Sequence, residues 1–200
     1  MIIGITGGTG CGKTTALSLI EELGGLVIDC DRVYHGLLET DKALLAAIEE
    51  RFPGTVEAGS LNRQALAAIV FSDEKALLDL NAITHKAVKK EVLRLLSGGP
   101  SLAAIDAIGL FEGQLDSLCD TTLAITAPED LRILRLTERD GITREQALAR
   151  IRAQKKQEWF VNKCAHHLHN DGTKEAFRLK CIALYKNLGI IKENEKENPL

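Results

Sequence analysis

The stretch Gly7-Gly8-Thr9-Gly10-Cys11-Gly12-Lys13-Thr14 decides how the surrounding chain folds. It follows a short β-branched run and precedes a segment of helical periodicity, which is the setting of a phosphate-binding loop of the form G-x-x-x-x-G-K-[ST]. Glycines let backbone N–H groups turn inward around phosphates in conformations that a Cβ would forbid. The helix that follows points the positive end of its dipole at the same anion. The sequence therefore predicts a strand, loop and helix that bind a nucleoside triphosphate such as ATP.

Residues of this loop have distinct expected roles. Lys13 can reach the β- and γ-phosphates, and the Thr14 hydroxyl can ligate Mg²⁺. The expected nucleotide-binding residues are Gly8, Gly10, Cys11, Gly12, Lys13, Thr14 and Thr15. The alternative, a glycine turn before an ordinary helix, leaves the match at every position of the motif unexplained. The loop alone names no reaction, because kinases, GTPases and motor ATPases share it.

Beyond the loop, short β-branched runs alternate with helical segments. This alternation predicts an α/β fold with three layers and a five-stranded parallel sheet joined by crossover helices. The expected strands are Ile2–Thr6, Leu26–Asp29, Leu102–Asp106, Thr121–Ile125 and His166–His169. The expected helices are Lys13–Leu23, Arg32–Leu38, Lys42–Arg51, Arg63–Val70, Glu74–Leu96, Leu131–Arg139, Arg144–Lys155 and Thr173–Leu188.

Uneven spacing of the strands predicts two insertions in the nucleotide-binding core. The core is expected to comprise residues 1–30, 98–138 and 158–190. The mostly helical stretch 31–97 is longer than a single crossover requires and is expected to bind the acceptor substrate. Residues 139–157 are expected to form a movable lid. The charged tail 191–200 has few apolar residues and is expected to be disordered.

Composition limits the classes of partner. Hydrophobic residues make up 45 % of the chain and charged residues 26 %, which is ordinary for a soluble globular enzyme, and the net charge of −3 argues against bulk affinity for nucleic acid. No apolar stretch is long enough for a membrane helix, and no leader segment is recognisable. Five scattered cysteines fit a reducing cytoplasm. We expect a cytoplasmic protein that acts on small molecules as a monomer or weak homo-oligomer.

Two carboxylates, Asp29 and Asp31, lie at the end of the second expected strand. The carboxyl ends of parallel strands face the ligand crevice of an open sheet. Phosphorylation of an alcohol needs a group there that accepts the hydroxyl proton and orients the oxygen toward the γ-phosphate. The alternating order Asp-Cys-Asp suggests that both side chains point the same way, but the strand ends here, which leaves open that only one of them faces the γ-phosphate. The alternative is that Asp31 caps the helix expected from Arg32.

Arginines gather where the lid is expected. Arg132, Arg135 and Arg139 share one face of a helix, and Gln146, Arg150 and Gln154 recur every four residues on the next. Thr143 and Gln146 form a capping box at the start of that second helix. Guanidinium groups beside the hinge Asp140-Gly141 can neutralise charge on the γ-phosphate, and closure excludes water. A solvated charged face remains the alternative.

Other patterns are weaker. Leu77, Leu80, Thr84, Val88, Val92 and Leu95 form an apolar stripe, with Asn81 and His85 side by side at its edge. Asp106–Gly109 fits the D-x-x-G of GTPases, but Ala165 stands where the guanine-reading Asp of N-K-x-D belongs. Cys164, His166, His167 and His169 alternate between the two faces of a strand, which disfavours a zinc site.

In order and spacing, several segments together resemble the dephospho-coenzyme A kinase family over Met1–Leu188. They are Ile3–Thr14, Asp29–Asp31, Arg63 with Ile69–Asp73, Leu80–His85, Leu110–Glu112, Arg135 with Arg139–Gly141, Ala149-Arg150 with Gln154, and Asn170–Gly172. The resemblance implies ATP-dependent phosphorylation of the ribose 3′-hydroxyl of dephospho-CoA. It also implies a P-loop core with a helical CoA-binding subdomain and a lid.

By the same resemblance, Asp31 is the catalytic base, assisted by Lys13 and the lid residue Arg139, and Asn170 lies at the adenine end of ATP. The residues expected to bind the acceptor are Asp29, Arg63, Phe71, Asn81, His85, Leu110 and Glu112. Mg²⁺ is the expected metal, with Thr14 as its ligand.

Three positions depart from the family pattern: Lys86 replaces a usual Pro, Gly109 lies in a segment that is usually Pro-Leu-Leu-Phe-Glu, and His166 replaces a usual Asp. These changes leave the ATP half intact and affect the acceptor half. The alternatives to a dephospho-CoA kinase are another nucleoside or nucleotide kinase and a nucleotide switch without catalysis. A nucleic-acid-dependent ATPase lacks the basic and aromatic patch it needs.

Overall fold

The structure is a computed structural model that describes residues 1–192 and centres on a parallel sheet. Within those residues the sheet has five strands, in the order β2 (Leu26–Asp29), β5 (Ala103–Asp106), β1 (Ile2–Thr6), β6 (Thr121–Thr126) and β7 (His166–His169). Every neighbouring pair is parallel. The predicted fold class is confirmed. Most of the tail predicted to be disordered, residues 193–200, lies outside the described residues.

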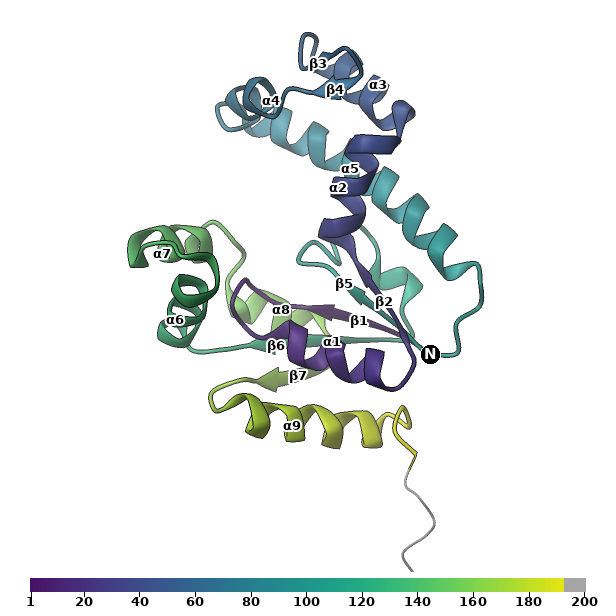
Figure 1. The fold of residues 1–200 in the computed structure, drawn as a ribbon, viewed down its shortest axis with the longest axis vertical. Coiled ribbons are helices and arrows are strands. Elements are labelled where there is room, and N and C mark those ends of the chain that lie inside the picture. Colours follow the sequence, from purple (N-terminus) through teal and green to yellow (C-terminus); the bar gives the residue numbers. More distant parts are fainter. Residues whose placement is uncertain (193–200) are drawn as a thin grey trace, which may run out of the picture.

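Helices cover both faces of this sheet. On one face, α1 (Lys13–Glu22) and α9 (Lys174–Asn187) lie side by side (Figure 1) and bury Ile3, Ile5, Leu123 and Ile125 of the strands. The Tyr185 hydroxyl of α9 donates a hydrogen bond to the Ala16 carbonyl of α1 at 3.0 Å. On the other face, α8 (Gln157–Lys163) packs on β6 and buries Phe160 completely. The phosphate loop connects the carboxyl end of β1 to the start of α1, so it lies at the carboxyl edge of the sheet.

The segment between β2 and β5 forms an arm that rises from the sheet (Figure 1). Its helices are α2 (Cys30–Thr40), α3 (Lys42–Arg51), α4 (Arg63–Val70) and α5 (Glu74–Leu96). They enclose a hydrophobic core of their own that includes Ile48, Phe52 and Leu66. On α5 the predicted stripe is correct at Leu80, Thr84, Val88 and Val92, which are buried, but wrong at Leu77. Leu77 is 38 % exposed, and Ala76 takes the buried place instead.

The arm also contains a hairpin, β3 (Val56–Glu57) and β4 (Ser60–Leu61), where the sequence predicted no strand. Its turn is made by Ala58 and Gly59, both with positive φ, and lacks the Asn-Gly or Asp-Gly pair that usually identifies such turns. The Glu49 carboxylate of α3 organises the approach to it by accepting hydrogen bonds from the backbone N–H groups of residues 54–56.

After β6, α6 (Glu129–Asp140) and α7 (Arg144–Arg152) form a helical pair beside the sheet (Figure 1). Gly141, at φ 64°, ends α6 in the left-handed conformation. The predicted capping box at the start of α7 is confirmed, since the Thr143 hydroxyl accepts from the Gln146 N–H while the Gln146 side chain accepts from the Thr143 N–H. A 3₁₀ turn, η1 (Asp116–Leu118), precedes β6. Within residues 1–192, no helix has both the length and the apolar composition that crossing a bilayer requires.

Candidate functional site

The phosphate loop has the conformation that its glycines predict. Gly12 is the N-cap of α1 at φ 96°, and Gly10 has φ 76°. A Cβ at Gly12 would collide with the side-chain amide of Asn170, so Gly is required both for the backbone conformation and for close packing. Cys11 and Thr15 are buried, whereas Thr14 is exposed at the start of the helix. Burial raises the pKa of the Cys11 thiol, which favours its neutral form.

Lys13 and Asp106 lie next to each other at the carboxyl edge of the sheet. The Lys13 ammonium donates to the Gly7 carbonyl at 3.1 Å and lies 3.8 Å from Asp106 Oδ1, close enough for charge attraction but too far for a hydrogen bond. Among the described residues, nothing donates a hydrogen bond to that buried oxygen. Burial raises the pKa of Asp106 to about 6; Lys13 opposes this rise, and the charges of Asp29 and Asp31 add to it.

The two aspartates at the end of β2 have different places in the structure: one caps α2 and the other does not. Asp29 is the N-cap of α2, and its Oδ1 accepts a hydrogen bond from the Arg32 N–H at 3.0 Å. The helix begins at Cys30, so the two side chains do not alternate along a strand and only Asp31 is left free by the cap. The capping role considered for Asp31 is wrong, because Asp29 is the cap. Asp31 lies in the first turn of α2, is exposed, and has a carboxylate that its own helix does not use.

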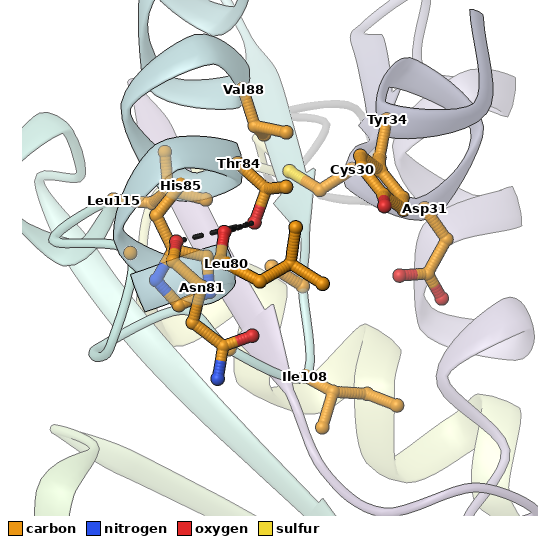
Figure 2. Close-up of a pocket in the computed structure, with 13 residues that line it drawn as sticks. Cys30, Asp31, Tyr34, Leu80, Asn81, Thr84, His85, Val88, Ile108 and Leu115 are labelled. Carbon is orange, nitrogen blue, oxygen red and sulfur yellow. Dashed lines mark hydrogen bonds between the residues drawn. The ribbon is translucent and has the colours of Figure 1, made fainter. Parts of the chain in front are cut away.

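Asp31 lies on the boundary between two cavities. The first, ≈ 400 Å³, lies over the phosphate loop and is also lined by Asp106, Arg135 and Arg139. The second, ≈ 220 Å³, lies between α2 and α5 and is also lined by Asn81 and His85. Figure 2 shows the Asp31 carboxylate and the Asn81 amide on the side of this second cavity toward Ile108, which lines both.

A third cavity, ≈ 210 Å³ and mostly apolar, continues from the second toward the tip of the arm. Tyr34 and Leu80 line both of these cavities, so the two adjoin. Arg63 and Phe71 line the third, and Phe71 is 85 % exposed. The three cavities therefore form a row from the phosphate loop to the end of the arm.

The predicted arginine face of α6 does lie against the phosphate loop. Arg135 donates to the Gly10 carbonyl at 3.2 Å, and Arg139 lines the cavity above the loop. The Asp140 carboxylate forms ion pairs with Arg139 Nε at 2.7 Å and with Arg150 Nη1 at 2.8 Å. One carboxylate thus binds two of the guanidinium groups expected to meet the γ-phosphate. These ion pairs hold the pKa of Asp140 below its usual range.

Residues 1–175 match the dephospho-CoA kinase family. A dephospho-CoA kinase of Deinococcus radiodurans is 36 % identical over 192 residues, covering 94 % of this chain and 92 % of that protein. One of Carboxydothermus hydrogenoformans is 34 % identical and covers 92 % of each chain. The crystal structure of TT1252 from Thermus thermophilus superposes with a TM-score of 0.78 at 34 % identity, covering 96 % of this chain and 98 % of that one.

The chain belongs to the dephospho-CoA kinase family. The resemblance noted in the sequence is thereby confirmed, and with it the expectation of a phosphotransferase that uses ATP.

Not all the residues expected to bind the family's acceptor lie at the cavities. Asn81 and His85 line the second cavity, and Arg63 and Phe71 the third. Leu110, by contrast, is fully buried, and its methyl groups lie where a Cβ at Gly4 would be. Glu112 is exposed outside the three cavities described here. The structure thus places Leu110 in the core of the domain.

Asn170, expected at the adenine end of ATP in this family, is 4 % exposed and supports the loop from behind. Its Nδ2 donates to the Cys11 carbonyl at 2.9 Å, and its Oδ1 accepts from Arg135 at 3.2 Å. The side-chain amide therefore links the phosphate loop to Arg135 of α6.

The three departures from the family pattern have simple structural consequences. Lys86 lies within α5, which runs without a break from Glu74 to Leu96. Gly109 lines the second cavity beside His85, whose Nε2 lies 3.7 Å from where a Cβ would be. His166 begins β7 and pairs with Leu123. Of the three, Gly109 is the one that enlarges a cavity.

Sequence reasoning missed two parts of the site. Asp106 was considered as part of a GTPase motif, although a carboxylate at the end of the third expected strand could have identified it by the rule applied to Asp29 and Asp31. Arg132 was predicted on the arginine face just ahead of the lid, whereas the structure buries it against the loop.

Two of the three histidines of β7 meet at the Thr126 hydroxyl, which lies 2.7 Å from His167 and 2.8 Å from His169. No group of three or more metal-binding side chains occurs among residues 1–192.

Proposed function

We propose that the protein transfers the γ-phosphoryl group of ATP to the ribose 3′-hydroxyl of dephospho-CoA, giving coenzyme A and ADP. The observation that carries the proposal is the position of Asp31, which lines both the cavity over the phosphate loop and the cavity between α2 and α5. A carboxylate there can accept the proton of an acceptor hydroxyl and orient its oxygen toward the γ-phosphate.

The row of cavities supports an elongated acceptor. Dephospho-CoA carries a nucleotide at one end and a long pantetheine arm at the other, and the second and third cavities offer room in that order. We assign Asn81 and His85 to the ribose end and Arg63 and Phe71 to the far end. In this proposal residues 31–97 are the acceptor-binding insert of a core that comprises residues 1–30, 98–138 and 158–190.

On the donor side, the loop N–H groups and Lys13 hold the phosphates, and the start of α1 adds its dipole. Arg139 lines the same cavity and would neutralise charge that spreads over the γ-phosphoryl group. For this, Arg139 must break its ion pair with Asp140 and bind phosphate oxygens instead. Movement of residues 139–157 is therefore part of the proposed cycle. That movement would also exclude water, which competes with the acceptor.

The site suits a magnesium ion. Asp106 Oδ1 is buried with no hydrogen bond from the described part of the chain, and the exposed Thr14 hydroxyl borders the same cavity. Mg²⁺ is usually held in proteins by one or two such groups together with phosphates and water. We propose that Thr14 and Asp106 hold the ion, Asp106 directly or through water. Bound there, Mg²⁺ would neutralise charge on the β- and γ-phosphates.

We also propose that the reaction takes place in the cytoplasm. All five cysteines of the chain lie within the described residues and are free thiols. Unpaired thiols of this kind are typical of reducing compartments.

A coupled ADP-release assay with dephospho-CoA, adenosine, AMP or water as acceptor tests the proposal. We expect rapid ADP release with dephospho-CoA and slow release with the other three. Preference for adenosine or AMP would indicate another nucleoside or nucleotide kinase. ATP binding without ADP release in any arm would indicate a nucleotide switch, and either result would overturn the proposed reaction.

A further inference from the structure

Thr9, the third residue of the phosphate loop, has both backbone polar groups bonded to side chains, one from the lid and one from the helix that precedes it. Its N–H donates to Gln154 Oε1 at 2.8 Å, and its carbonyl accepts from Arg132 Nε at 2.8 Å. Arg132 Nη2 also approaches Gln154 Oε1, at 3.4 Å, which closes the arrangement into a triangle. Gln154 lies in the lid, just beyond the C-cap of α7, and Arg132 belongs to α6, the helix that leads into the lid. Both therefore meet at one residue of the loop.

Arg132 is an unusual residue to find at this place because it is only 4 % exposed. Burial lowers the pKa of its guanidinium group, and no carboxylate of residues 1–192 forms an ion pair with it. A buried charge without an ionic partner is costly unless its donors are used. Its Nε–H and Nη2–H groups are used by Thr9 and Gln154. A Cβ at Gly8 would collide with the same guanidinium group, so the loop is shaped to fit it.

We propose that Arg132 and Gln154 are positioning residues that hold Thr9, and through it the phosphate loop, in the conformation that binds ATP. Neither side chain lines the cavity over the loop. They would therefore act from behind it, without touching the nucleotide. Because Gln154 lies at the end of the lid helix, the affinity for ATP depends on the position of the lid. This inference rests on the proposed ATP site.

The expected signature is selective for ATP. Removing the Gln154 side chain leaves the Thr9 N–H without its partner, so this turn of the loop becomes more mobile in the free protein. Part of the free energy of ATP binding is then spent on ordering the loop, and the affinity for ATP falls. The acceptor cavities share no residue with the triangle, so the KM for dephospho-CoA should be unaffected. A purely structural role would instead lower the melting temperature and leave the affinity for ATP unchanged.

Calorimetric titration of Mg·ATP into the full-length protein tests this with Gln154→Ala, Arg132→Lys and the control Arg144→Ala. Arg144 is also a lid residue, but its guanidinium group pairs with the exposed Asp130, and among the described residues it forms no hydrogen bond with the loop. We expect the Kd for ATP to rise about 5-fold in Gln154→Ala, the equivalent of one net hydrogen bond, and about 10-fold or more in Arg132→Lys, which keeps the charge but loses the planar donors. The control should bind as the wild type does.

Hydrogen exchange of the peptide covering residues 7–14 gives a second readout: exchange should accelerate in Gln154→Ala and stay unchanged in Arg144→Ala. Should Arg132→Lys fail to fold, Gln154→Ala decides alone, because its side chain is only half-buried. Wild-type affinity for ATP in Gln154→Ala, or an equal loss in the control, would overturn the inference. A wild-type protein that bound no ATP would instead overturn the proposed function.

Discussion

Asp106→Asn should change how stability depends on pH, because Asp106 is buried with an orphaned oxygen and a pKa of about 6. An unfolded Asp has a pKa near 3.9, so the folded protein holds this proton more tightly than the unfolded chain does. The contribution of this group to stability is therefore full below about pH 4 and is lost as the pH rises through about 6. At about 1.4 kcal/mol per pKa unit the full effect is roughly 3 kcal/mol, of which about 2 kcal/mol falls between about pH 4.5 and 7.5.

Urea unfolding of the ATP-free protein at those two pH values measures the effect. Asn cannot ionise, so the stability of Asp106→Asn relative to the wild type should increase by about 2 kcal/mol from the lower to the higher pH. This comparison of differences cancels whatever the Asn amide itself gains or loses beside Lys13. Asp130→Asn, which removes a carboxylate that is 86 % exposed, is the matched control and should show no such increase. A difference between wild type and Asp106→Asn that is the same at both pH values would refute the reasoning.

The same group should report on magnesium. A cation beside Asp106 lowers its pKa, so Mg·ATP binding near pH 6, where this carboxyl is about half protonated, should release about half a proton more from the wild type than from Asp106→Asn. Binding enthalpies measured in buffers of different ionisation enthalpy give the number of protons released. Equal proton release in the two proteins would place the ion away from Asp106.

Other predictions concern single residues of the site. Asp31→Asn should keep the affinity for ATP in a calorimetric titration while kcat falls about 10²-fold or more, and a near-normal kcat would remove Asp31 from proton transfer. Lys13→Ala should abolish ATP binding and turnover, and unchanged turnover would refute the phosphate-loop assignment. Trp159 lies just past α7 with its ring edge-to-face with Phe111 at 5.8 Å, so its fluorescence should change when ATP and dephospho-CoA bind together. A flat signal through saturation would argue against lid closure near it.

Elements with strong local signals could be predicted from the sequence, and elements that depend on tertiary contacts could not. The strands β1, β2 and β7 were predicted with their observed bounds. β-branched residues and flanking turns define β1 and β2 locally, whereas β7 has no β-branched residue and is marked by its length and its flanking turn. The hairpin of β3 and β4 depends on Glu49, which binds three backbone N–H groups several residues away. Helix α8 has seven residues, fewer than periodicity can separate from a loop, and its stability comes from burying Phe160.

The site shows the same division. The phosphate loop is a contiguous motif, so it could be identified directly from the sequence. The face shared by Arg132, Arg135 and Arg139 could also be predicted, because residues at i, i+3 and i+7 lie on one side of a helix. Which of the three would be buried could not, since that depends on how closely α6 approaches Thr9. For the same reason sequence reasoning could not tell that Asn170 supports the loop from behind.

The charges around the loop suggest why this site should bind a metal–triphosphate complex and not either component alone. Without ligands, Asp106 is a buried carboxyl with an unsatisfied oxygen, and Arg132 is a buried guanidinium without an ionic partner among the described residues. They have opposite signs, yet they lie on different sides of the loop and do not pair with each other. A cation beside Asp106 would stabilise its ionised form, and phosphates on the loop would lower the cost of the positive charge behind it. Each unfavourable charge of the free protein would thus become favourable when both halves of Mg·ATP are bound at the proposed site.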